Sequence, residues 1–388
     1  MKPWLIVTGD FVKTGGMDVA NHALASYLAR MGHEVHLVAH RVADDLRRLA
    51  NVYVHEARKP LDSYYLGRKH LDRLGRRWAG RIADRGGRVV VNGGNCRWGD
   101  VNWVHYVHAA YAPEVVGSGA KRLTNAWKRS AFLAEERAAL AEAQVVVTAS
   151  RATRRHLVEH LRVPEAKIRT VYYGTDPELA RPATPLERGA VRGRMGWPDG
   201  VPVALFVGAL GDRRKGFDTV LEAWRMLEWR QAGEVRLAVV GRGAELPAWQ
   251  VRVERAGLSS KIAFLGFRDD VPQLMRAADL LVAPARYEPY GLGVHEALCS
   301  GTPAIVSARA GVSEKYPAEL RDLLLDDPED PGRLADGIVR WMSDRARYRG
   351  VLQGVSQSLR AWTWDHMAEA LVRAAEGQAG PEMLKLSA

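Results

Sequence analysis

The chain has 388 residues, of which 47% are hydrophobic and 26% charged, as in an ordinary globular protein of about two domains. No apolar run of about 18 uncharged residues exists, so the sequence predicts no membrane-spanning helix. Two cysteines, Cys96 and Cys299, are too few for a disulfide framework or a zinc site, which is typical of a cytoplasmic protein. The net charge of +11 indicates either an anionic partner or a surface kept soluble by its charge.

The first half of the chain alternates apolar runs with helical patterns. Strands are predicted at WLIVTG, EVHLVAH, RVVVNGG (88–94), VNWVHYVH (101–108) and AQVVVTAS (143–150), and a helix at VANHALASYLARMG. The opening MKPWLIVTGDF is too short an apolar run for a secretory signal and predicts a buried strand. This alternation predicts a parallel, doubly wound sheet.

One basic segment of this half, residues 62–85, has the spacing of an amphipathic helix. It places Leu71, Leu74, Trp78 and Ile82 on one face and arginines with a lysine on the others. A helix packed on its own sheet accounts for the pattern. The alternative is an interfacial helix that docks on anionic lipid, which would suit a lipid-linked acceptor.

The segment 172–189, YYGTDPELARPATPLERG, is rich in Pro and Gly and is the predicted linker. After it, strands are predicted at 201–210, 235–243 and 262–267, a helix at about 218–227, and a helix running into a strand at VPQLMRAADLLVAPA. A second doubly wound domain follows from this pattern. Ligands of such sheets bind outside the carboxyl ends of the strands.

Glycine-bearing turns follow several of these predicted strands. In TGGMD, Gly15 and Gly16 precede a helix and could admit an anion to its N-terminus, although a plain tight turn explains them as well. In VGALGDRRKGFD, Arg213, Arg214 and Lys215 crowd one loop. The loop is either a solvated charge cluster or a seat for a diphosphate.

The stretch YEPYGLGVHEALCSG (287–301) places Glu288 and Glu296 around Gly291 and Gly293, with a helix expected to begin near Leu292. The helix N-terminus favours an anion, whereas carboxylates accept hydrogen bonds from hydroxyl groups. A phosphate flanked by hydroxyl-rich groups describes a nucleotide sugar. The alternatives are a favourable first-turn acid at Glu296 and a solvated loop acid at Glu288.

Taken in order, these motifs resemble the GT-B glycosyltransferases, and in particular the large retaining family 4. The resemblance rests on the E-x7-E stretch, the GG loop, VYYGTD, KGFDTVLEAW, IAFLGF, AADLLVAPA, TPAIVS and a C-terminal helix containing Trp. It implies an α/β fold of two Rossmann-like domains facing a central cleft. The acceptor domain would be 1–178, the nucleotide-sugar domain 179–361, and 362–388 a helix packing back on the first domain.

The resemblance also implies roles for single residues. Glu296 matches the acid that holds the ribose, Glu288 the acid at the donor sugar, and Lys215 the lysine on the diphosphate. His108 matches the active-site histidine, with His105 as its rival. The implied catalytic residues are His108, Glu288 and Lys215, and the implied donor-binding residues are Gly15, Gly16, Arg213, Arg214, Lys215, Gly266, Phe267, Glu288, Tyr290, Gly291, Leu292, Gly293 and Glu296.

The chain departs from the family pattern at two positions and leaves one choice open. Ala209 stands where an arginine is usual, so either Arg213 or Arg214 would supply that charge, and Tyr173 stands where an asparagine is usual. His105 and His108 would point to opposite faces of one strand, so only one could line the cleft.

We therefore expect a retaining, metal-independent transfer of sugar from a nucleotide-diphospho-sugar to a hydroxyl acceptor, without a cofactor. A nucleotide-sugar epimerase of the same fold and a catalytically inactive binding protein are the alternatives. A phosphorylase would need a pyridoxal lysine and a longer chain, and no aromatic and basic module indicates nucleic acid. The expected location is cytoplasmic, with contact to the inner face of a membrane through residues 62–85.

Overall fold

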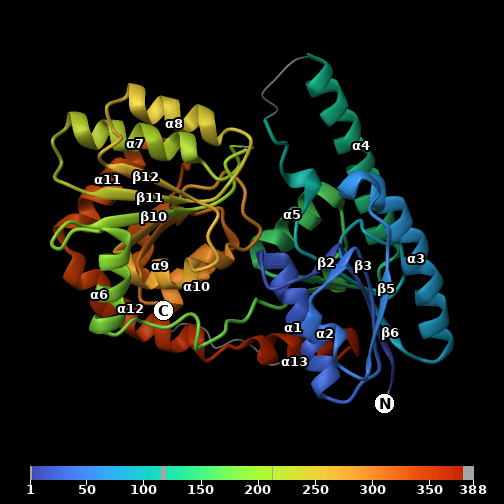
Figure 1. Cartoon of the computed structure of the whole chain (residues 1–388). Coiled ribbons are helices and arrows are strands. Elements are labelled where there is room, and N and C mark those ends of the chain that lie inside the picture. The colour runs from blue at the N-terminus through green and yellow to red at the C-terminus, as the bar shows by residue number, and fades with distance from the viewer. Residues whose placement is uncertain (1, 115–118, 212, 379–388) are drawn as a thin grey trace. The chain divides into compact units, whose positions relative to one another are not determined.

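A computed structural model describes residues 2–114, 119–211 and 213–378 of the chain (Figure 1). The contacts divide it into two compact units. The described residues up to Gly174, together with those from Thr363 onward, form the N-terminal unit, and Thr175–Trp362 form the C-terminal unit. The domain boundaries expected at residues 178 and 361 lie close to these crossings, and residues 379–388 of the expected C-terminal segment lie outside the described residues.

The N-terminal unit contains a seven-stranded parallel sheet of order β5-β3-β1-β6-β7-β8-β9. Its strands are β1 (Trp4–Val7), β3 (Val35–Ala39), β5 (Val52–Glu56), β6 (Arg88–Val91), β7 (Val101–Val104), β8 (Val145–Thr148) and β9 (Ile168–Thr170). A separate short ladder pairs β2 (Asp10–Phe11) with β4 (Arg41–Val42). All four residues of β1 are buried, as expected of a strand with neighbours on both sides and helices on both faces.

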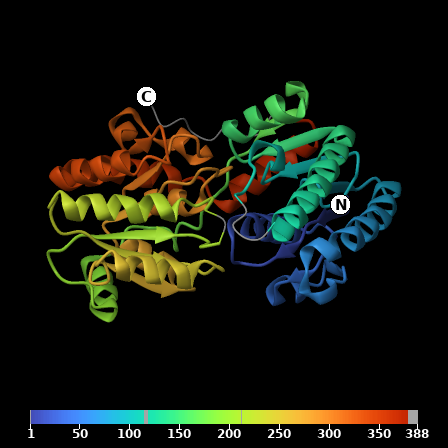
Figure 2. The same ribbon diagram turned by 90° about the horizontal axis from the view of Figure 1, so that it is seen from above.

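Helices cover both faces of this sheet (Figure 2). They are α1 (Gly16–Arg30), α2 (Asp44–Arg47), α3 (Tyr64–Asp84), α4 (Gly119–Glu142), α5 (Arg151–Leu161) and α13 (Trp364–Ala375), with short 3-10 helices η1 (Pro60–Asp62), η2 (His108–Ala110) and η3 (Glu165–Lys167). The predicted return of the C-terminal helix is confirmed, because α13 packs on α1 and Asp365 pairs with Arg30.

Helix α3 packs its apolar face on its own sheet. Leu71 and Ile82 are buried in one cluster with residues of β1, β3 and β6, and Leu74 and Trp78 pack against that cluster. The Trp78 ring stacks on the imidazole of His55, with 3.6 Å between the ring centroids. The expectation that this apolar face docks on lipid is therefore wrong, because the sheet already covers it.

The C-terminal unit contains a six-stranded parallel sheet of order β12-β11-β10-β13-β14-β15. The strands are β10 (Val203–Val207), β11 (Arg236–Val240), β12 (Ile262–Gly266), β13 (Leu280–Ala283), β14 (Ala304–Ser307) and β15 (Leu324–Leu325). Strand β10 pairs with β11 on one side and with β13 on the other. The strand order reverses here, and a doubly wound sheet binds its ligand outside the carboxyl ends of the strands at such a point.

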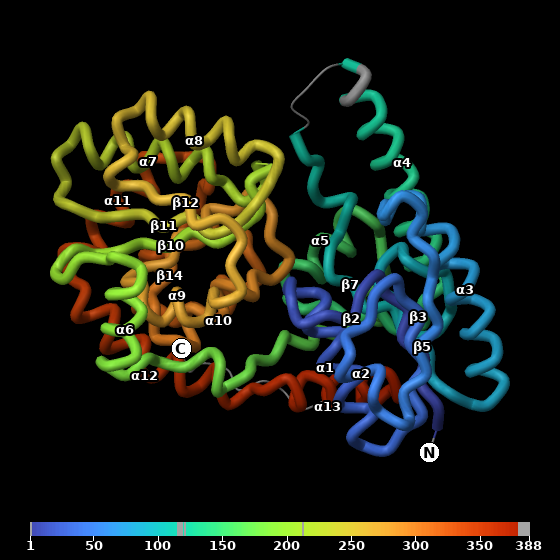
Figure 3. The backbone as a smooth tube through the Cα atoms, in the orientation of Figure 1, coloured from blue at the N-terminus to red at the C-terminus, as the bar shows by residue number. Residues whose placement is uncertain are grey.

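The helices of this unit are α6 (Pro185–Met195), α7 (Phe217–Trp229), α8 (Leu246–Arg255), α9 (Val271–Ala277), α10 (Leu292–Cys299), α11 (Pro331–Ser343) and α12 (Arg345–Arg360), with 3-10 helices η4 (Gly311–Lys315) and η5 (Ala318–Leu323). Helices α7 and α8 lie on one face of the sheet and α9 and α10 on the other (Figure 3). The predicted α/β class with two parallel-sheet domains is confirmed.

The linker is shorter than the predicted segment 172–189, because that segment includes the start of α6. Thr184 caps the helix: its hydroxyl accepts the N–H of Glu187 at 3.2 Å, and its own N–H donates to Glu187 Oε2 at 2.8 Å. This is a capping box, with Pro185 at the first helical position. The Thr-x-x-Glu spacing was available in the sequence and outweighs the local content of Pro and Gly.

Candidate active site

An ion pair between Lys215 and Glu288 lies at the carboxyl edge of the C-terminal sheet, where β10 and β13 end. Arg214 extends it: its Nη1 is 3.7 Å from Glu288 Oε2 and donates to the carbonyl of Tyr287 at 3.1 Å. Parallel strands end at one edge, so two loops far apart in the sequence deliver these groups to one place. The structure thereby brings together three of the predicted site residues.

The charges of this pair depend on one another. Burial disfavours the charged form of Glu288, but Lys215 and Arg214 outweigh that effect and hold the pKa of Glu288 below its usual value. The carboxylate is therefore ionised at neutral pH. An incoming diphosphate would share these two cations with Glu288. The cations would therefore reduce the repulsion between the diphosphate and the Glu288 carboxylate.

Glu296 lies one turn into α10, the helix that follows the loop carrying Glu288. No described residue makes a hydrogen bond or ion pair to its half-buried carboxylate, and burial raises its pKa to about 7. The first turn of α10 holds no acid, so the alternative of a favourable first-turn acid does not apply. A half-buried carboxylate that lacks a protein partner is available to a ligand that donates hydrogen bonds.

The loop between the two acids is held by its own backbone. Gly291 caps α10 with φ of 106°, and a Cβ there would lie 2.9 Å from Val312 Cγ1. The carbonyl of Tyr290 accepts the N–H of Val312 at 2.7 Å. Gly293 differs, because a Cβ at that position would meet nothing within 4 Å. The open space at Gly293 leaves the first turn of α10 accessible from outside.

Tyr290 is placed differently from the other predicted donor-binding residues. Its side chain is buried, and its hydroxyl lies 2.9 Å from Nδ1 of the buried His295. Burial lowers the pKa of His295 to about 3, so this imidazole is neutral. The expectation of Tyr290 as a donor-binding residue therefore applies to its backbone only, and its ring supports the loop from below.

Arg213 and Arg214 lie in different surroundings. Arg213 has the left-handed backbone conformation, with φ of 53°, and its carbonyl accepts from Arg286 Nη1 at 2.6 Å. Arg286 in turn pairs with Asp218 at 2.7 Å, at the start of α7. Arg214 is the arginine that approaches Glu288. The side chain of Arg214 therefore lies beside Glu288, and which of the two arginines replaces the one missing at Ala209 stays a prediction.

Gly266 and Phe267 follow the edge strand β12. The Phe267 ring is 56% exposed, and the guanidinium of Arg242 lies 4.9 Å from its centroid. The N–H of Gly241, beside Arg242, donates to the carbonyl of Gly266 at 2.8 Å. Sequence reasoning missed Arg242, which lies within the predicted strand 235–243 but two residues beyond the end of β11 at Val240. An exposed ring backed by a cation can stack on a flat aromatic group.

In the N-terminal unit, Gly15 and Gly16 begin α1 rather than forming a loop before it. Gly15 is the N-cap, with φ of 89°, and Gly16 is the first helical residue, earlier than the predicted start at Val19. Asp18 lies in the first turn. Burial and the neighbouring Asp10 raise the pKa of Asp18 to about 7, despite the opposing charge of Arg41.

A polar cluster that the sequence did not reveal surrounds the end of β1. Asp10 is buried, accepts from Arg41 Nε at 3.0 Å, and accepts the hydroxyl of Tyr64. With Asp18 these groups form a set of donors and acceptors at the carboxyl edge of the N-terminal sheet. The only available signal was the position of Asp10 directly after the first strand. Its partners come from β4 and α3, which no local pattern could indicate.

His105 and His108 do not share a strand, because β7 ends at Val104. The prediction that VNWVHYVH is one strand, with its alternation argument, is therefore wrong. His105 is buried, lies 3.3 Å from Asn21 Nδ2, and bonds the hydroxyl of Tyr173. Burial lowers its pKa to about 3, so it is a neutral core histidine. The unusual Tyr173 is thus its hydrogen-bond partner.

His108 begins η2, and 38% of its side chain is exposed. The buried carboxylate of Glu136 lies 3.2 Å from its Nδ1 and accepts its backbone N–H at 2.9 Å. Such a carboxylate orients the imidazole and leaves Nε2 directed outward. His108 is therefore the accessible histidine of the two. Among the described residues, no three His, Cys, Asp or Glu side chains are grouped as a metal site requires.

Two families match the chain. Residues 188–352 match the family described as Glycosyl transferases group 1, and residues 14–179 match the one described as Glycosyltransferase Family 4. Together they cover most of both units. The first match includes Lys215, Glu288 and Glu296, and the second includes Gly15 and His108.

Curated relatives share about three tenths of their residues with the chain. A glycosyltransferase of Methanocaldococcus jannaschii, described as uncharacterized, is 28% identical over 58% of this chain and 58% of the relative. The mannosylfructose-phosphate synthase of Agrobacterium fabrum is 30% identical over 57% of this chain and 50% of the relative. The chain thus spans only about half to three fifths of the length of these relatives.

Solved structures share the fold over nearly the whole chain. The sucrose-phosphate synthase of Thermosynechococcus elongatus has a TM-score of 0.78 at 21% identity, covering 97% of this chain and 99% of the other. The Anabaena protein HepE, solved with UDP and glucose, has a TM-score of 0.72 at 16% identity, covering 97% and 100%. At these identities the likeness establishes the fold alone.

Proposed function

Because the chain belongs to the group 1 and family 4 glycosyltransferases of the GT-B fold, we propose that it transfers a sugar from a nucleotide-diphospho-sugar to a hydroxyl acceptor. The observation that carries the proposal is the Lys215–Glu288 ion pair, which lies at the end of β10 and β13 beside the open first turn of α10. The half-buried Glu296 follows in the same helix α10, and no described residue pairs with it. The cations and the helix N-terminus would bind a diphosphate, and the carboxylates would accept hydrogen bonds from the hydroxyl groups on both sides of it.

The chemistry follows from the charges that develop. Breaking a glycosyl–phosphate bond builds negative charge on the leaving diphosphate and positive charge on the sugar carbon. Lys215, Arg214 and the N–H groups of α10 would stabilise the leaving group, and the ionised Glu288 would stabilise the sugar. Glu296 would accept the ribose hydroxyls. We propose that these cations take the place of a metal ion, and that the acceptor attacks from the face that the leaving group vacates, with retention.

The comparisons support the donor class. HepE, which shares the fold, was solved with UDP and with UDP-glucose. We therefore propose a nucleoside diphosphate sugar as donor, with the exposed Phe267 and Arg242 as the surface on which the base stacks. No cofactor besides the donor is part of this proposal.

The acceptor is proposed to bind the N-terminal unit. The Asp10, Asp18, Arg41 and Tyr64 cluster offers both donors and acceptors of hydrogen bonds, as a hydroxyl-rich acceptor requires. His108, oriented by Glu136, is proposed to contact the reacting sugar. Gly15 and Gly16 begin α1 beside this cluster and would bring N–H groups to the diphosphate.

Two other outcomes, an epimerase of this fold and an inactive binding protein, are separated by one assay. The protein is incubated with a panel of nucleotide sugars without an acceptor, and released sugar and nucleoside diphosphate are measured. Slow hydrolysis with retained anomeric configuration supports the transferase. Conversion of the donor to an epimer, or binding without any turnover in the presence or absence of acceptors, would contradict it.

The roles of the two glutamates are tested by their separate losses. Glu296→Gln should weaken binding of the nucleoside diphosphate product and of the donor alike, because the ribose is present in both. Glu288→Gln should leave product affinity nearly unchanged and lower kcat, because the product has no sugar. Calorimetric titration and single-turnover rates measure the two effects. Equal weakening of product binding by both variants would show that the assignment is wrong.

We also propose peripheral contact with an anionic membrane, through a surface other than the apolar face of α3. Exposed apolar side chains lie on the outer part of α3 and on α4: Leu66 is 47% exposed, Leu123 74% and Trp127 66%. The two helices meet there through Tyr65, whose ring lies 5.8 Å from that of Trp127. Lys69 and Lys128 add positive charge to these faces. Apolar side chains beside lysines suit an anionic bilayer interface.

Vesicle co-sedimentation tests this surface. Binding to phosphatidylglycerol vesicles should exceed binding to neutral vesicles and should fall as salt rises, since the screening length shortens from about 10 Å at 0.1 M to about 3 Å at 1 M. Trp127→Glu should abolish it. Trp229→Glu is the matched control, because Trp229 is 84% exposed on α7 of the other unit. Equal binding by the two variants would contradict the proposal.

No described helix has the length and apolar character to cross a membrane.

A further inference from the structure

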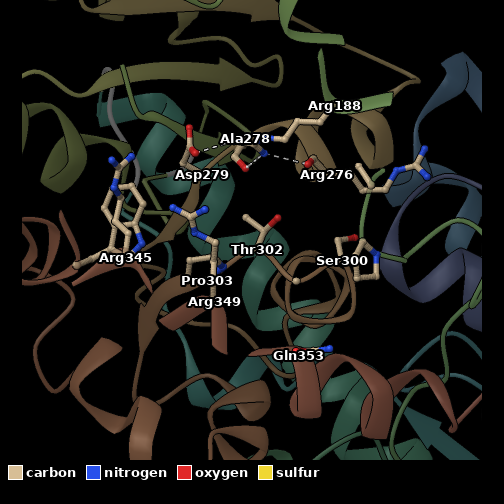
Figure 4. A pocket seen from close by; sticks show the side chains of 14 residues that line it. Arg188, Arg276, Ala278, Asp279, Ser300, Thr302, Pro303, Arg345, Arg349 and Gln353 are labelled. Carbon is tan, nitrogen blue, oxygen red and sulfur yellow. Dashed lines mark hydrogen bonds and ion pairs between the residues drawn. The ribbon is translucent and has the colours of Figure 1, made fainter. Parts of the chain in front are cut away.

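The C-terminal unit has a pocket at the amino edge of its sheet, opposite the edge that carries Lys215 and Glu288. The pocket measures about 450 Å³ and lies where β13 and β14 begin, with Asp279 and Pro303 directly before those strands (Figure 4). Helices α6, α9, α11 and α12 form its walls. The donor-binding edge and this pocket are therefore separated by the length of the parallel strands.

Four arginines line the pocket, together with a single acid. They are Arg188 from α6, Arg276 from α9, and Arg345 and Arg349 from α12, and the acid is Asp279. Figure 4 shows Arg345 and Arg349 on one side of the pocket, with Arg188 and Arg276 across from them. Ser300, Thr302 and Gln353 add polar groups to the lining, and Pro182, Pro303 and Trp341 add apolar ones.

The one acid is already fully engaged by protein groups. Its Oδ1 accepts from Arg188 Nη2 at 2.6 Å, and its Oδ2 accepts from Arg192 Nη1 at 3.0 Å and from the N–H of Val203 at 2.9 Å. Asp279 therefore has little capacity left for the other cations. Burial lowers the pKa of the Arg188 guanidinium, and although Asp279 opposes this, Arg192 and Arg349 lower it further, which reflects the crowding of positive charge.

The remaining three arginines have no acidic partner among the described residues: no ion pair involves Arg276, Arg345 or Arg349. The Nε of Arg276 is buried, and no group in the described part of the chain forms a hydrogen bond with it. Arg345 and Arg349 stand four residues apart at the start of α12, so like charges are neighbours at the positive end of a helix dipole. Their neighbour Arg347 differs, because it pairs with Asp322 at 3.1 Å.

We infer that this pocket binds a soluble anion that carries more than one phosphate group. Guanidinium groups bind phosphate oxygens in pairs, and several of them around a roomy pocket suit a multivalent phosphate better than a single small ion. The pocket has the size of an ordinary small-molecule site. A neighbouring groove of about 350 Å³ shares Arg188, Asp279 and Arg345, which extends the site for a longer ligand.

The proposed anion site is independent of the proposed transferase activity, so the test must separate the two. The proposed donor site would also bind phosphates, and it is therefore filled with saturating nucleoside diphosphate before titration. Inorganic tripolyphosphate is then added to the full-length protein, and binding is measured by calorimetry. We expect one further binding event in the wild type. Its absence would overturn the inference and leave the transferase proposal untouched.

Substitutions of the pocket arginines test whether tripolyphosphate binds in this pocket. Arg345→Gln and Arg349→Gln should each weaken tripolyphosphate binding by about tenfold or more, as expected for loss of a charge-assisted hydrogen bond. Arg345→Lys and Arg349→Lys keep the charge but lose the paired geometry, so their affinities should fall between those of the wild type and the glutamine variants. Arg321→Gln, an exposed arginine of the same unit outside the pocket, is the matched control.

Two further measurements check that the variants fold and which class of anion the pocket binds. Thermal unfolding should be nearly unchanged in these variants, because Arg345 and Arg349 make no ion pair with any residue that the structure describes. Unchanged tripolyphosphate affinity in the Arg345→Gln/Arg349→Gln double variant would contradict the site. Citrate bound as tightly as tripolyphosphate would contradict the phosphate class. Loss of binding to phosphatidylglycerol vesicles in the double variant, without any effect on tripolyphosphate, would assign the arginines to lipid and overturn the soluble ligand.

Discussion

Lys215 is the residue on which the proposed chemistry depends most directly, since it is the cation that pairs with Glu288 at the end of β10. Lys215→Ala should weaken nucleoside diphosphate binding and lower kcat together. A charge-assisted hydrogen bond contributes about 1.5–3 kcal/mol, which corresponds to a loss of about 10- to 150-fold. Calorimetry with the diphosphate and steady-state rates measure both changes.

The control for Lys215→Ala is Lys261→Ala. Lys261 pairs with Glu228 in the same unit and directly precedes β12, so it lies at the amino edge of the sheet, opposite the edge that carries Lys215. This variant should retain both affinity and turnover. Similar losses in the two variants would mean that general stability, and not phosphate binding, explains the effect of Lys215→Ala.

Glu296 makes stability depend on pH, because burial raises its pKa to about 7. The folded state holds this proton more tightly than the unfolded chain, whose carboxyl has the ordinary pKa of 4.5. The resulting stability is complete below about pH 4.5 and is lost as the pH rises through about 7. Glu296→Gln resembles the protonated form, so it should be about 1–3 kcal/mol more stable than the wild type at pH 8.

Chemical denaturation at pH 4.5 and at pH 8 tests the sign of this effect. The difference between Glu296→Gln and the wild type should be near zero at the lower pH and favour the variant at the higher one. A difference that does not change with pH would show that the variant acts through packing. The same substitution should still weaken binding of the nucleotide. At pH 8 the variant should therefore be more stable than the wild type but bind the nucleotide less tightly.

At the scale of elements, the loop from β10 to α7 is held by one glycine. Gly216 is the N-cap of α7, with φ of 76°, and a Cβ there would lie 2.0 Å from the carbonyl oxygen of Pro284, just after β13. The two loops that present Lys215 and Glu288 thus touch backbone to backbone. Only glycine permits this approach together with a left-handed conformation.

Gly216→Ala should therefore destabilise the C-terminal unit and lower activity. The left-handed backbone contributes about 1–2 kcal/mol, and the contact with Pro284 a further ~1–3 kcal/mol. Gly200→Ala is the matched control, because Gly200 has φ of +80° and a Cβ there meets nothing within 4 Å. Denaturation by urea should rank Gly216→Ala well below Gly200→Ala. Equal stability of the two would show that the Pro284 contact relaxes freely.

At the scale of the whole molecule, each unit has a core of its own, although the chain crosses between them twice. Helix α13 follows the second crossing and buries Leu371 in the N-terminal unit, whereas Ile338 of α11 is buried in the C-terminal unit. Leu371→Ala should destabilise by about 2–5 kcal/mol through lost burial and the cavity left behind. The effect should fall on the unit that holds β1, far away in the sequence.

Hydrogen exchange resolved along the chain measures where each loss falls. Leu371→Ala should speed exchange in α1 and the N-terminal sheet, and Ile338→Ala should speed it in the C-terminal sheet. The pair of variants thus serves as mutual controls. Faster exchange throughout both units from either substitution would show that the units unfold as one cooperative body.

Sequence by itself determined the fold class and pointed to most residues of the proposed donor-binding edge. Buried strands of parallel sheets are continuous apolar runs, so β1, β8 and β10 were visible, and the family spacing of Lys215, Glu288 and Glu296 pointed to one edge of one sheet. These features can be read from local residue patterns and from the order of the motifs along the chain. They depend on the path of the backbone and less on which side chains contact one another.

Only the tertiary structure decided the contacts between distant segments. His105 is a core histidine because Tyr173 and Asn21 form hydrogen bonds with it. The ring of Trp78 stacks on His55 of the neighbouring strand β5 and does not face solvent alone. Asp10 forms hydrogen bonds with Arg41 and Tyr64, and four arginines from α6, α9 and α12 lie together at the edge opposite the proposed donor site. Periodicity states which face of an element is apolar but not which partner covers it, because that partner is set by the packing of elements far apart in the chain.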